Sequence, residues 1–116
     1  MPKRDLRLYL HDIKDSAEAI KLFTFDMDLE TFKNDRKTYS ATIREFEIIG
    51  EAVKNLPDSL LCKYDEVSWR DIRDFRNLLI HGYFGVDFEI VWNTIKVDLP
   101  ILDIVVKKML KELYGE

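Results

Sequence analysis

The strongest constraint on the fold is a run of apolar residues near the end of the chain, spaced alternately by three and four positions. Its members are Trp92, Ile95, Leu99, Leu102, Val106, Met109 and Leu113. This spacing puts one side chain per turn on one face of an α-helix, whereas strand side chains alternate every two residues. We therefore predict a long amphipathic helix that starts near Asp87. Pro100 lies inside the run, and its missing amide hydrogen should bend the helix between Lys96 and Pro100.

Earlier segments have the same helical periodicity. Residues 3–24 place apolar side chains on one face, namely Leu6, Leu10, Ile13, Ala17 and Ile20. Residues 38–56 do likewise with Ile43, Phe46, Gly50 and Val53. Pro57 should end that helix, because the residue before a proline avoids helical angles. Between these two segments, residues 25–37 predict a loop with a brief helix capped by Asp28.

A further helix is predicted from Ser68 to about His81. Ser68 should act as its N-cap, with Asp71 standing in for the acidic residue of a capping box. Gly82 and Gly85 then allow a helix C-cap and a turn. No segment has the period of a half-buried strand. The chain should therefore form one all-α domain over residues 1–116, an up-and-down bundle of four main helices with a short extra helix or two.

Length and composition limit the protein to a single domain that folds without metals or disulfides. The chain has 116 residues, 47% of them hydrophobic, which suffices for one core. Cys62 is its only cysteine, so we expect an ordinary half-buried thiol and a reducing, cytoplasmic location. No apolar run is long enough to span a membrane, and residues 1–10 carry charges where a signal peptide would be apolar.

The net charge of −4 argues against a protein that coats nucleic acid, because such binding needs clustered cations. A protein with this net charge can still carry a local positive site. Arg70, Arg73 and Arg76 recur every three residues and would share one strip of a helix. Two interpretations stay open at this point: a strip that faces RNA, or a surface of ion pairs with Asp71 and Asp74.

The segment with the most chemistry is Arg76-Asn-Leu-Leu-Ile-His81-Gly-Tyr83. Taken alone, His81 could cap a helix C-terminus, and Arg76 could belong to a surface ion pair. Five helical residues would separate Arg76 and His81 by about 140° around the axis. The two side chains therefore converge only at an unwound helix end or with the help of a second subunit.

This segment resembles the signature of the HepT-like members of the HEPN superfamily. The resemblance extends over nearly the whole chain, through residues 47–57 (EIIGEAVKNLP), Trp69, Val91-Trp92 and Leu99-Pro100. It implies a metal-independent endoribonuclease, the toxin of a type VII-like toxin–antitoxin pair. It also implies a homodimer in which two copies of the motif face each other.

By position, the resemblance makes Arg76 and His81 the catalytic residues and Asn77 a supporting polar residue. Tyr83 matches the tyrosine to which a cognate MntA-type nucleotidyltransferase attaches AMP, using ATP and Mg²⁺. This chain lacks a glycine-rich phosphate loop, so the ATP site should belong to the partner. RNA cleavage itself should need no cofactor and no metal.

The side chains suit this chemistry, because RNA carries its own nucleophile in the 2′-hydroxyl. Histidine titrates near neutral pH and can act as general acid or base. Arginine is always charged and can hold two phosphate oxygens. The main alternative is a non-catalytic HEPN module that binds nucleotide or substrate for a partner nucleotidyltransferase. A structural dimerisation module would explain only the apolar periodicity.

Other polar residues receive no catalytic role. His11 lies between core positions of the first helix and should be a surface or boundary side chain. Four charged residues of the second helix could contact the antitoxin, brace the active site or simply form a solvated face: Arg44, Glu45, Glu47 and Glu51.

Overall fold

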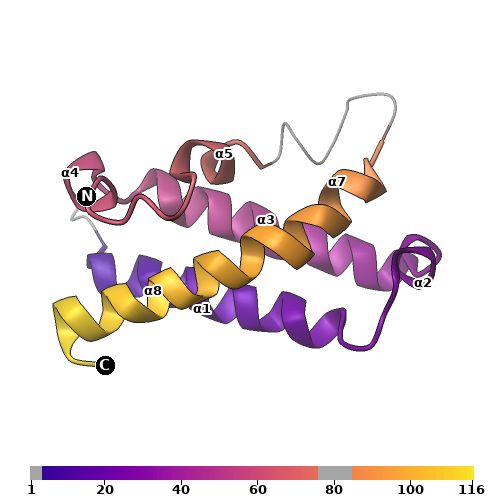
Figure 1. Ribbon diagram of the computed structural model, residues 1–116, viewed down its shortest axis with the longest axis horizontal. Coiled ribbons are helices and arrows are strands. Elements are labelled where there is room, and N and C mark those ends of the chain that lie inside the picture. The colour runs from indigo at the N-terminus through magenta and orange to yellow at the C-terminus, as the bar shows by residue number, and fades with distance from the viewer. Residues whose placement is uncertain (1–3, 76–84) are drawn as a thin grey trace.

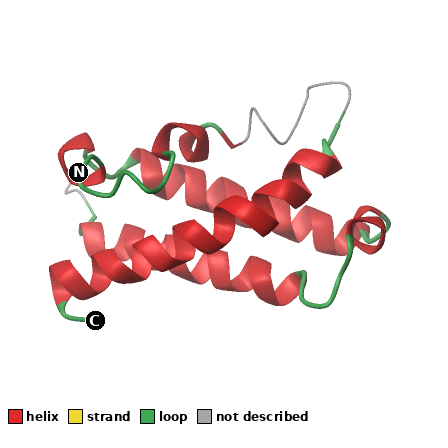
Figure 2. Ribbon diagram, viewed as in Figure 1, coloured by secondary structure: helices red, strands yellow, loops and turns green. Residues whose placement is uncertain are grey.

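The computed structural model describes residues 4–75 and 85–116, and helices dominate both ranges (Figure 2). Three long helical runs lie beside one another in Figure 1: α1 (Leu6–Phe23), α3 (Arg36–Lys54), and α7 (Phe88–Asn93) continuing into α8 (Leu99–Tyr114). Short helices α2 (Leu29–Lys33), α4 (Asp58–Leu61) and α5 (Trp69–Arg73) connect them. The described ranges contain no β-strand element. The predicted all-α class is confirmed.

Aspartate N-caps fix where the helices begin. The Asp28 carboxylate accepts a hydrogen bond from the Thr31 amide at 2.8 Å, so the predicted brief helix and its cap are confirmed. Asp35 accepts one from the Thr38 amide at 3.0 Å, which starts α3 two residues before the predicted Thr38. In both cases the carboxylate satisfies an amide that has no partner inside the helix.

The core lies where the apolar faces of α1, α3 and α8 meet. Each of these helices buries the residues that its periodicity selects, including Leu10, Ile13, Phe46, Val53, Leu102 and Met109. Leu113 was predicted to continue this face, but it is 45% exposed, and Leu110 takes the buried position in the last turn. The opposite face of α3 pairs its charges along the helix, Arg44 with Glu47 and Lys54 with Glu51.

The irregularity expected near Pro100 takes the form of a π-helical segment, η2 (Thr94–Asp98). Pro100 follows it in the first turn of α8, where a missing amide hydrogen costs least. The wider π-helical turn lies just before Pro100 and accommodates its ring within the helix. Figure 1 shows the ribbon passing from α7 to α8 without interruption.

Two local predictions were wrong. Ser68 is the N-cap residue of α5, but its hydroxyl donates to the Asp71 carboxylate at 2.8 Å and does not accept from the helix backbone. The pair therefore forms a side-chain contact in place of a capping box. Cys62 is exposed and not half-buried, because it lies at the outer end of α4, where its thiol contacts the Ser59 carbonyl at 3.4 Å.

No helix in residues 4–75 and 85–116 has both the length and the apolar character that crossing a membrane requires.

A buried carboxylate joins α1 to α8. Asp103 accepts hydrogen bonds from Lys21 at 2.6 Å and from Lys107 at 3.0 Å, and its side chain is 4% exposed. Burial alone would raise the pKa of Asp103, but these two hydrogen bonds outweigh it and hold the pKa below its ordinary value. The charged form of Asp103 therefore stabilises the contact between the two helices.

Replacing Asp103 by asparagine should lower the free energy of unfolding by about 1–3 kcal/mol near neutral pH, because hydrogen bonds to a charged group are lost. Since the folded-state pKa is depressed, this stabilisation is present above the unfolded pKa of about 3.9 and disappears as the pH falls through the folded-state value. Urea unfolding at several pH values measures both effects. Glu18→Gln, which loses only an exposed contact with Lys107 at 3.6 Å, is the matched control. Equal stability of Asp103→Asn and wild type at neutral pH would contradict the assignment.

Candidate active site

The residues singled out by the sequence motif lie outside the part of the chain that the structure describes. These are Arg76, Asn77, His81, Gly82 and Tyr83. The structure does describe the residues on both sides of the motif, from Trp69 to Phe75 and from Gly85 onward. These flanking residues determine where the motif starts and ends on the bundle.

Upstream of the motif, α5 is shorter than the helix predicted from Ser68 to His81. It ends at Arg73, and the backbone of Asp74 turns away from helical geometry, with φ −100° and ψ 15°. Asp74 therefore interrupts the predicted helix before residue 76. The rest of the predicted span, through His81, lies outside the described residues.

Two aromatic contacts hold α5 and the residue before the motif. The Trp69 indole donates a hydrogen bond to the Tyr64 carbonyl at 2.9 Å. Phe75 is buried and packs edge-on against Phe46 of α3, with 4.9 Å between the ring centroids. Because Phe75 directly precedes Arg76, the motif begins at a fixed point of the core.

Gly50 allows the close approach of α3 to α5. A Cβ atom at this position would lie 3.2 Å from the Ile72 carbonyl oxygen and 3.5 Å from that of Arg73. Any larger side chain would meet backbone, which cannot rotate away as a side-chain end can. Close backbone packing, and not an unusual backbone conformation, therefore favours glycine at this position.

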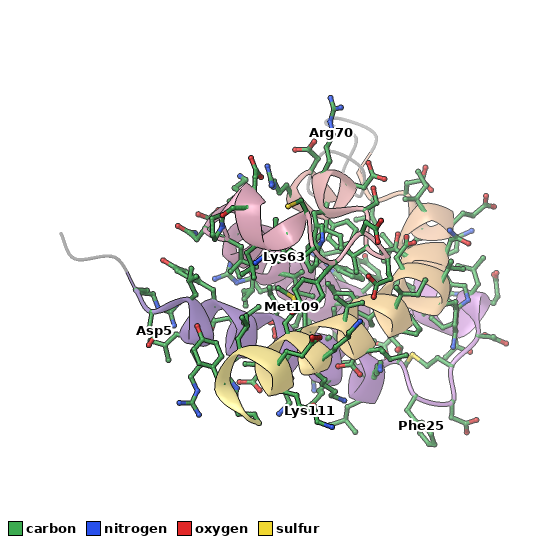
Figure 3. The ribbon with its side chains drawn as sticks, turned by 60° about the vertical axis from the view of Figure 1, so that its left-hand side comes forward. Asp5, Phe25, Lys63, Arg70, Met109 and Lys111 are labelled. Atoms are coloured by element: carbon green, nitrogen blue, oxygen red, sulfur yellow. The ribbon has the colours of Figure 1, made fainter. Side chains whose placement is uncertain are left out.

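The structure describes two of the three regularly spaced arginines, Arg70 and Arg73, and they differ in their contacts. Arg73 donates to Asp58 of α4 at 2.6 Å, and does not pair with Asp71 or Asp74 as the surface interpretation proposed. Arg70 is exposed and points away from the bundle in Figure 3. Arg70 is therefore accessible to an anion, whereas Arg73 ties α5 to α4.

Downstream of the motif, a turn and a cap fix the start of α7. Gly85 has φ +75°, a left-handed conformation that glycine adopts without strain and that fits the turn predicted here. The Asp87 carboxylate accepts a hydrogen bond from the Ile90 amide at 3.1 Å and caps α7, whose start near Asp87 was predicted. Phe88 packs edge-on against Tyr39, with centroids 4.9 Å apart. An anchored phenylalanine therefore lies near each end of the motif.

A cavity of about 310 Å³ adjoins Phe75 along the exposed face of α3. It is lined by Arg4, Tyr9, Asp12, Arg44, Phe46, Glu47, Ile48, Gly50, Glu51, Ala52, Lys54, Arg73 and Phe75. The Arg44–Glu47 and Lys54–Glu51 pairs are each 3.9 Å apart, so their charges are only loosely held. We call this cavity the α3 groove. Its lining carries both positive and negative side chains. It includes Arg44, Glu47 and Glu51, and Glu45 is not among its lining residues.

A smaller hollow of about 60 Å³, also lined by Phe75, lies between α5 and α8. Val67, Ile72 and Ile101 supply its apolar lining, with Asp71 and Asp98 at its edge. Burial first, and the nearby Asp71 charge second, raise the pKa of Asp98. The described residues contain no group of three or more His, Cys, Asp or Glu side chains arranged to hold a metal ion.

His11 has a structural contact. It is half-buried, and its Nε2 lies 2.9 Å from a Glu116 carboxylate oxygen, while Arg7 donates to the same carboxylate at 2.7 Å. This contact draws the C-terminal end of the chain back onto α1. It confirms His11 as a boundary residue.

A family model and several curated relatives place the chain among known proteins. The family model described as "Ribonuclease HepT-like" matches residues 13–109. The protein named "Putative RNase MJ0127" from Methanocaldococcus jannaschii is 41% identical over all of this chain and 96% of its own length. "Probable ribonuclease HepT" from Thermococcus cleftensis is 45% identical over 86% of this chain and 91% of its own. No solved structure matches. The chain belongs to the HepT-like family of the HEPN superfamily.

Proposed function

We propose that this protein is a metal-independent endoribonuclease toxin whose catalytic residues are Arg76 and His81. The observation that carries the proposal is the intact Arg-x-x-x-x-His motif in a chain that matches, over most of its length, relatives named as ribonucleases. The contacts on both sides of the motif support the proposal, because Phe75 and Phe88 are packed against the bundle near the two ends of the motif.

In this mechanism RNA supplies the nucleophile. His81 acts in the proton steps as general acid or base while the 2′-oxygen attacks the phosphorus and the bond to the 5′-oxygen breaks. Arg76 holds the phosphate oxygens and stabilises the charge that develops on them, and Asn77 orients one of the two side chains. The 2′-proton is removed and the leaving 5′-oxygen is protonated. The products are a 2′,3′-cyclic phosphate end and a 5′-hydroxyl end.

Purified protein should cleave tRNA or mRNA in the presence of EDTA and leave cyclic phosphate ends. Arg76→Ala and His81→Ala should each lose about 100-fold or more in rate, because a phosphate contact or a proton-transfer group is missing. Gel analysis of end-labelled RNA with end-group chemistry measures cleavage and product together. Products with 5′-phosphate ends would exclude this mechanism. Intact RNA from folded, unmodified protein would favour the non-catalytic module that serves a partner nucleotidyltransferase.

The proposed partner is a cognate MntA-type nucleotidyltransferase, the antitoxin, which uses ATP and Mg²⁺ to attach AMP to Tyr83. Tyr83 lies two residues after His81 in the chain. A bulky anionic group at this distance would repel an RNA phosphate from the catalytic histidine. The modification would thereby silence the ribonuclease.

Incubation with the cognate nucleotidyltransferase, ATP and Mg²⁺ should add the mass of AMP to the wild type and abolish RNA cleavage. Tyr83→Phe should gain no mass and should still cleave RNA after the same treatment, because it lacks the acceptor hydroxyl. Intact-protein mass spectrometry gives the first readout. Addition of AMP to Tyr83→Phe would assign the modification to another residue.

We also propose a homodimer that packs through an exposed apolar stripe on η2 and α8, consisting of Val97, Ile101 and Ile104. These side chains are 51%, 42% and 67% exposed. Two antiparallel copies of this helix, related by a two-fold axis between residues 102 and 103, would set Ile101 of each against Ile104 of the other. In the same register Lys108 would lie beside Val97 and Asp98. Because Ile101 lines the hollow that also contains Phe75, this face adjoins the start of the motif.

Substituting Ile104 by lysine should convert the dimer to a monomer, because two charges would meet near the two-fold axis in an apolar contact. Size-exclusion chromatography with light scattering at micromolar concentration measures the mass. Leu22→Lys, at an apolar side chain that is 76% exposed at the end of α1, is the matched control and should stay dimeric. Elution of the wild type at monomer mass would contradict the proposal.

A further inference from the structure

The hollow between α5 and α8 combines an apolar lining with acidic side chains. Its apolar residues are Val67, Ile72, Phe75 and Ile101, and its polar residues are Glu66, Ser68, Asp71 and Asp98. Its volume of about 60 Å³ is far below the roughly 300–1,000 Å³ of a pocket for a small molecule. The hollow therefore has room for the end of one long side chain and not for a nucleotide.

Two of the carboxylates at this hollow have no positive partner. Asp71 accepts a hydrogen bond from the Ser68 hydroxyl at 2.8 Å, and no cation of the described residues lies within ion-pair distance of Asp71 or Asp98. Burial, and after it the like charge of Asp71, raise the pKa of Asp98. A cation in the hollow would therefore stabilise the charged forms of both carboxylates.

The apolar stripe of the proposed homodimer is followed by a lysine that can supply this cation. Lys108 comes four residues after Ile104, on the same face of α8. Its ammonium is loosely held, because it lies 3.7 Å from Glu66 and 5.8 Å from the centre of the Tyr64 ring, and its side chain is 53% exposed. The neighbouring Lys107 is already bound to the buried Asp103. The stripe thus has an acidic end near the hollow and a basic end at Lys108.

We propose that the hollow between α5 and α8 receives Lys108 of a second copy of this chain, which pairs with Asp98. With the two-fold axis between residues 102 and 103, Lys108 of one copy lies at the level of Val97 of the other, one residue from Asp98. Packed helices have axes about 8–10 Å apart, a gap that a lysine side chain can bridge. The symmetry makes the contact twice. This inference rests on the homodimer in the proposed function and names the residues that pair across it.

Charge complementarity selects this arrangement. Two antiparallel copies set the acidic end of each stripe against the basic end of the other, whereas two parallel copies would set Asp98 against Asp98 and Lys108 against Lys108. Like charges that face each other across an interface cost several kcal/mol. Lys108 gives up only a loose, exposed contact with Glu66, which is worth little. The pair therefore fixes the direction and the register in which the apolar stripes meet.

The test is charge exchange, with the dimer dissociation constant measured by analytical ultracentrifugation. Asp98→Lys and Lys108→Asp should each raise Kd about tenfold or more, because each variant places like charges together at two symmetric contacts. The double variant Asp98→Lys/Lys108→Asp restores opposite charges and should return Kd to within about threefold of wild type. Asp15→Lys, the same charge change at an exposed position of α1, is the control and should keep the wild-type Kd.

The outcomes separate this inference from the proposed function. If wild type is a dimer, Ile104→Lys is a monomer, and Asp98→Lys keeps the wild-type Kd, the hollow does not receive Lys108 and the dimer through the stripe stands. If both single variants weaken the dimer and the double variant stays weak, Asp98 and Lys108 are not partners and the inference is wrong. If wild type is a monomer, the homodimer fails and this inference fails with it, while RNA cleavage is decided by its own assay.

Discussion

The close packing of α5 on α3 at Gly50 is the contact on which the placement of the motif depends. A Cβ atom there would lie 3.2 Å from the Ile72 carbonyl oxygen, so the α5 backbone would have to shift by a few tenths of an ångström. Phe46, one turn earlier on α3, receives Phe75 from the same side. One face of α3 therefore both completes the core and locates the residue before Arg76. Stability and the geometry of the site are linked because the same helix provides both.

The features that the sequence predicts best depend on residues close together in the chain. The cap at Asp28 follows from the residue type at a helix start, and the start of α7 near Asp87 and the buried faces of α1, α3 and α8 follow from spacing within a single helix. Features that depend on distant residues could not be predicted in this way. No local pattern links Asp58 to Arg73, and the same arginine spacing is equally compatible with pairing to Asp71 or Asp74. The hydroxyl of Ser68 had two possible partners, and its contact with Asp71 prevailed over the backbone.

The candidate site divides in the same way. The roles assigned to Arg76, Asn77, His81 and Tyr83 come from the resemblance of the motif to the HepT-like signature, because the residue types alone are equally compatible with a helix cap and a surface ion pair. Sequence does not indicate what surrounds them. That both the α3 groove and the hollow beside Ile101 adjoin Phe75 follows only from the packing of three helices. In the proposed function the motif would supply the reaction, and the bundle determines which surfaces lie beside it.

The charge distribution fits a protein that acts on RNA without coating it. With a net charge of −4, the molecule as a whole repels a polyanion, so binding must come from cations placed locally. In the described chain Arg70 is exposed, and Arg44 and Lys54 are held at 3.9 Å by acidic neighbours that an RNA phosphate could replace. Because Glu47 and Glu51 stay in the groove, each cation that turns to RNA leaves a carboxylate behind. In the proposed function, RNA binding would therefore rest on a few cationic contacts beside the motif.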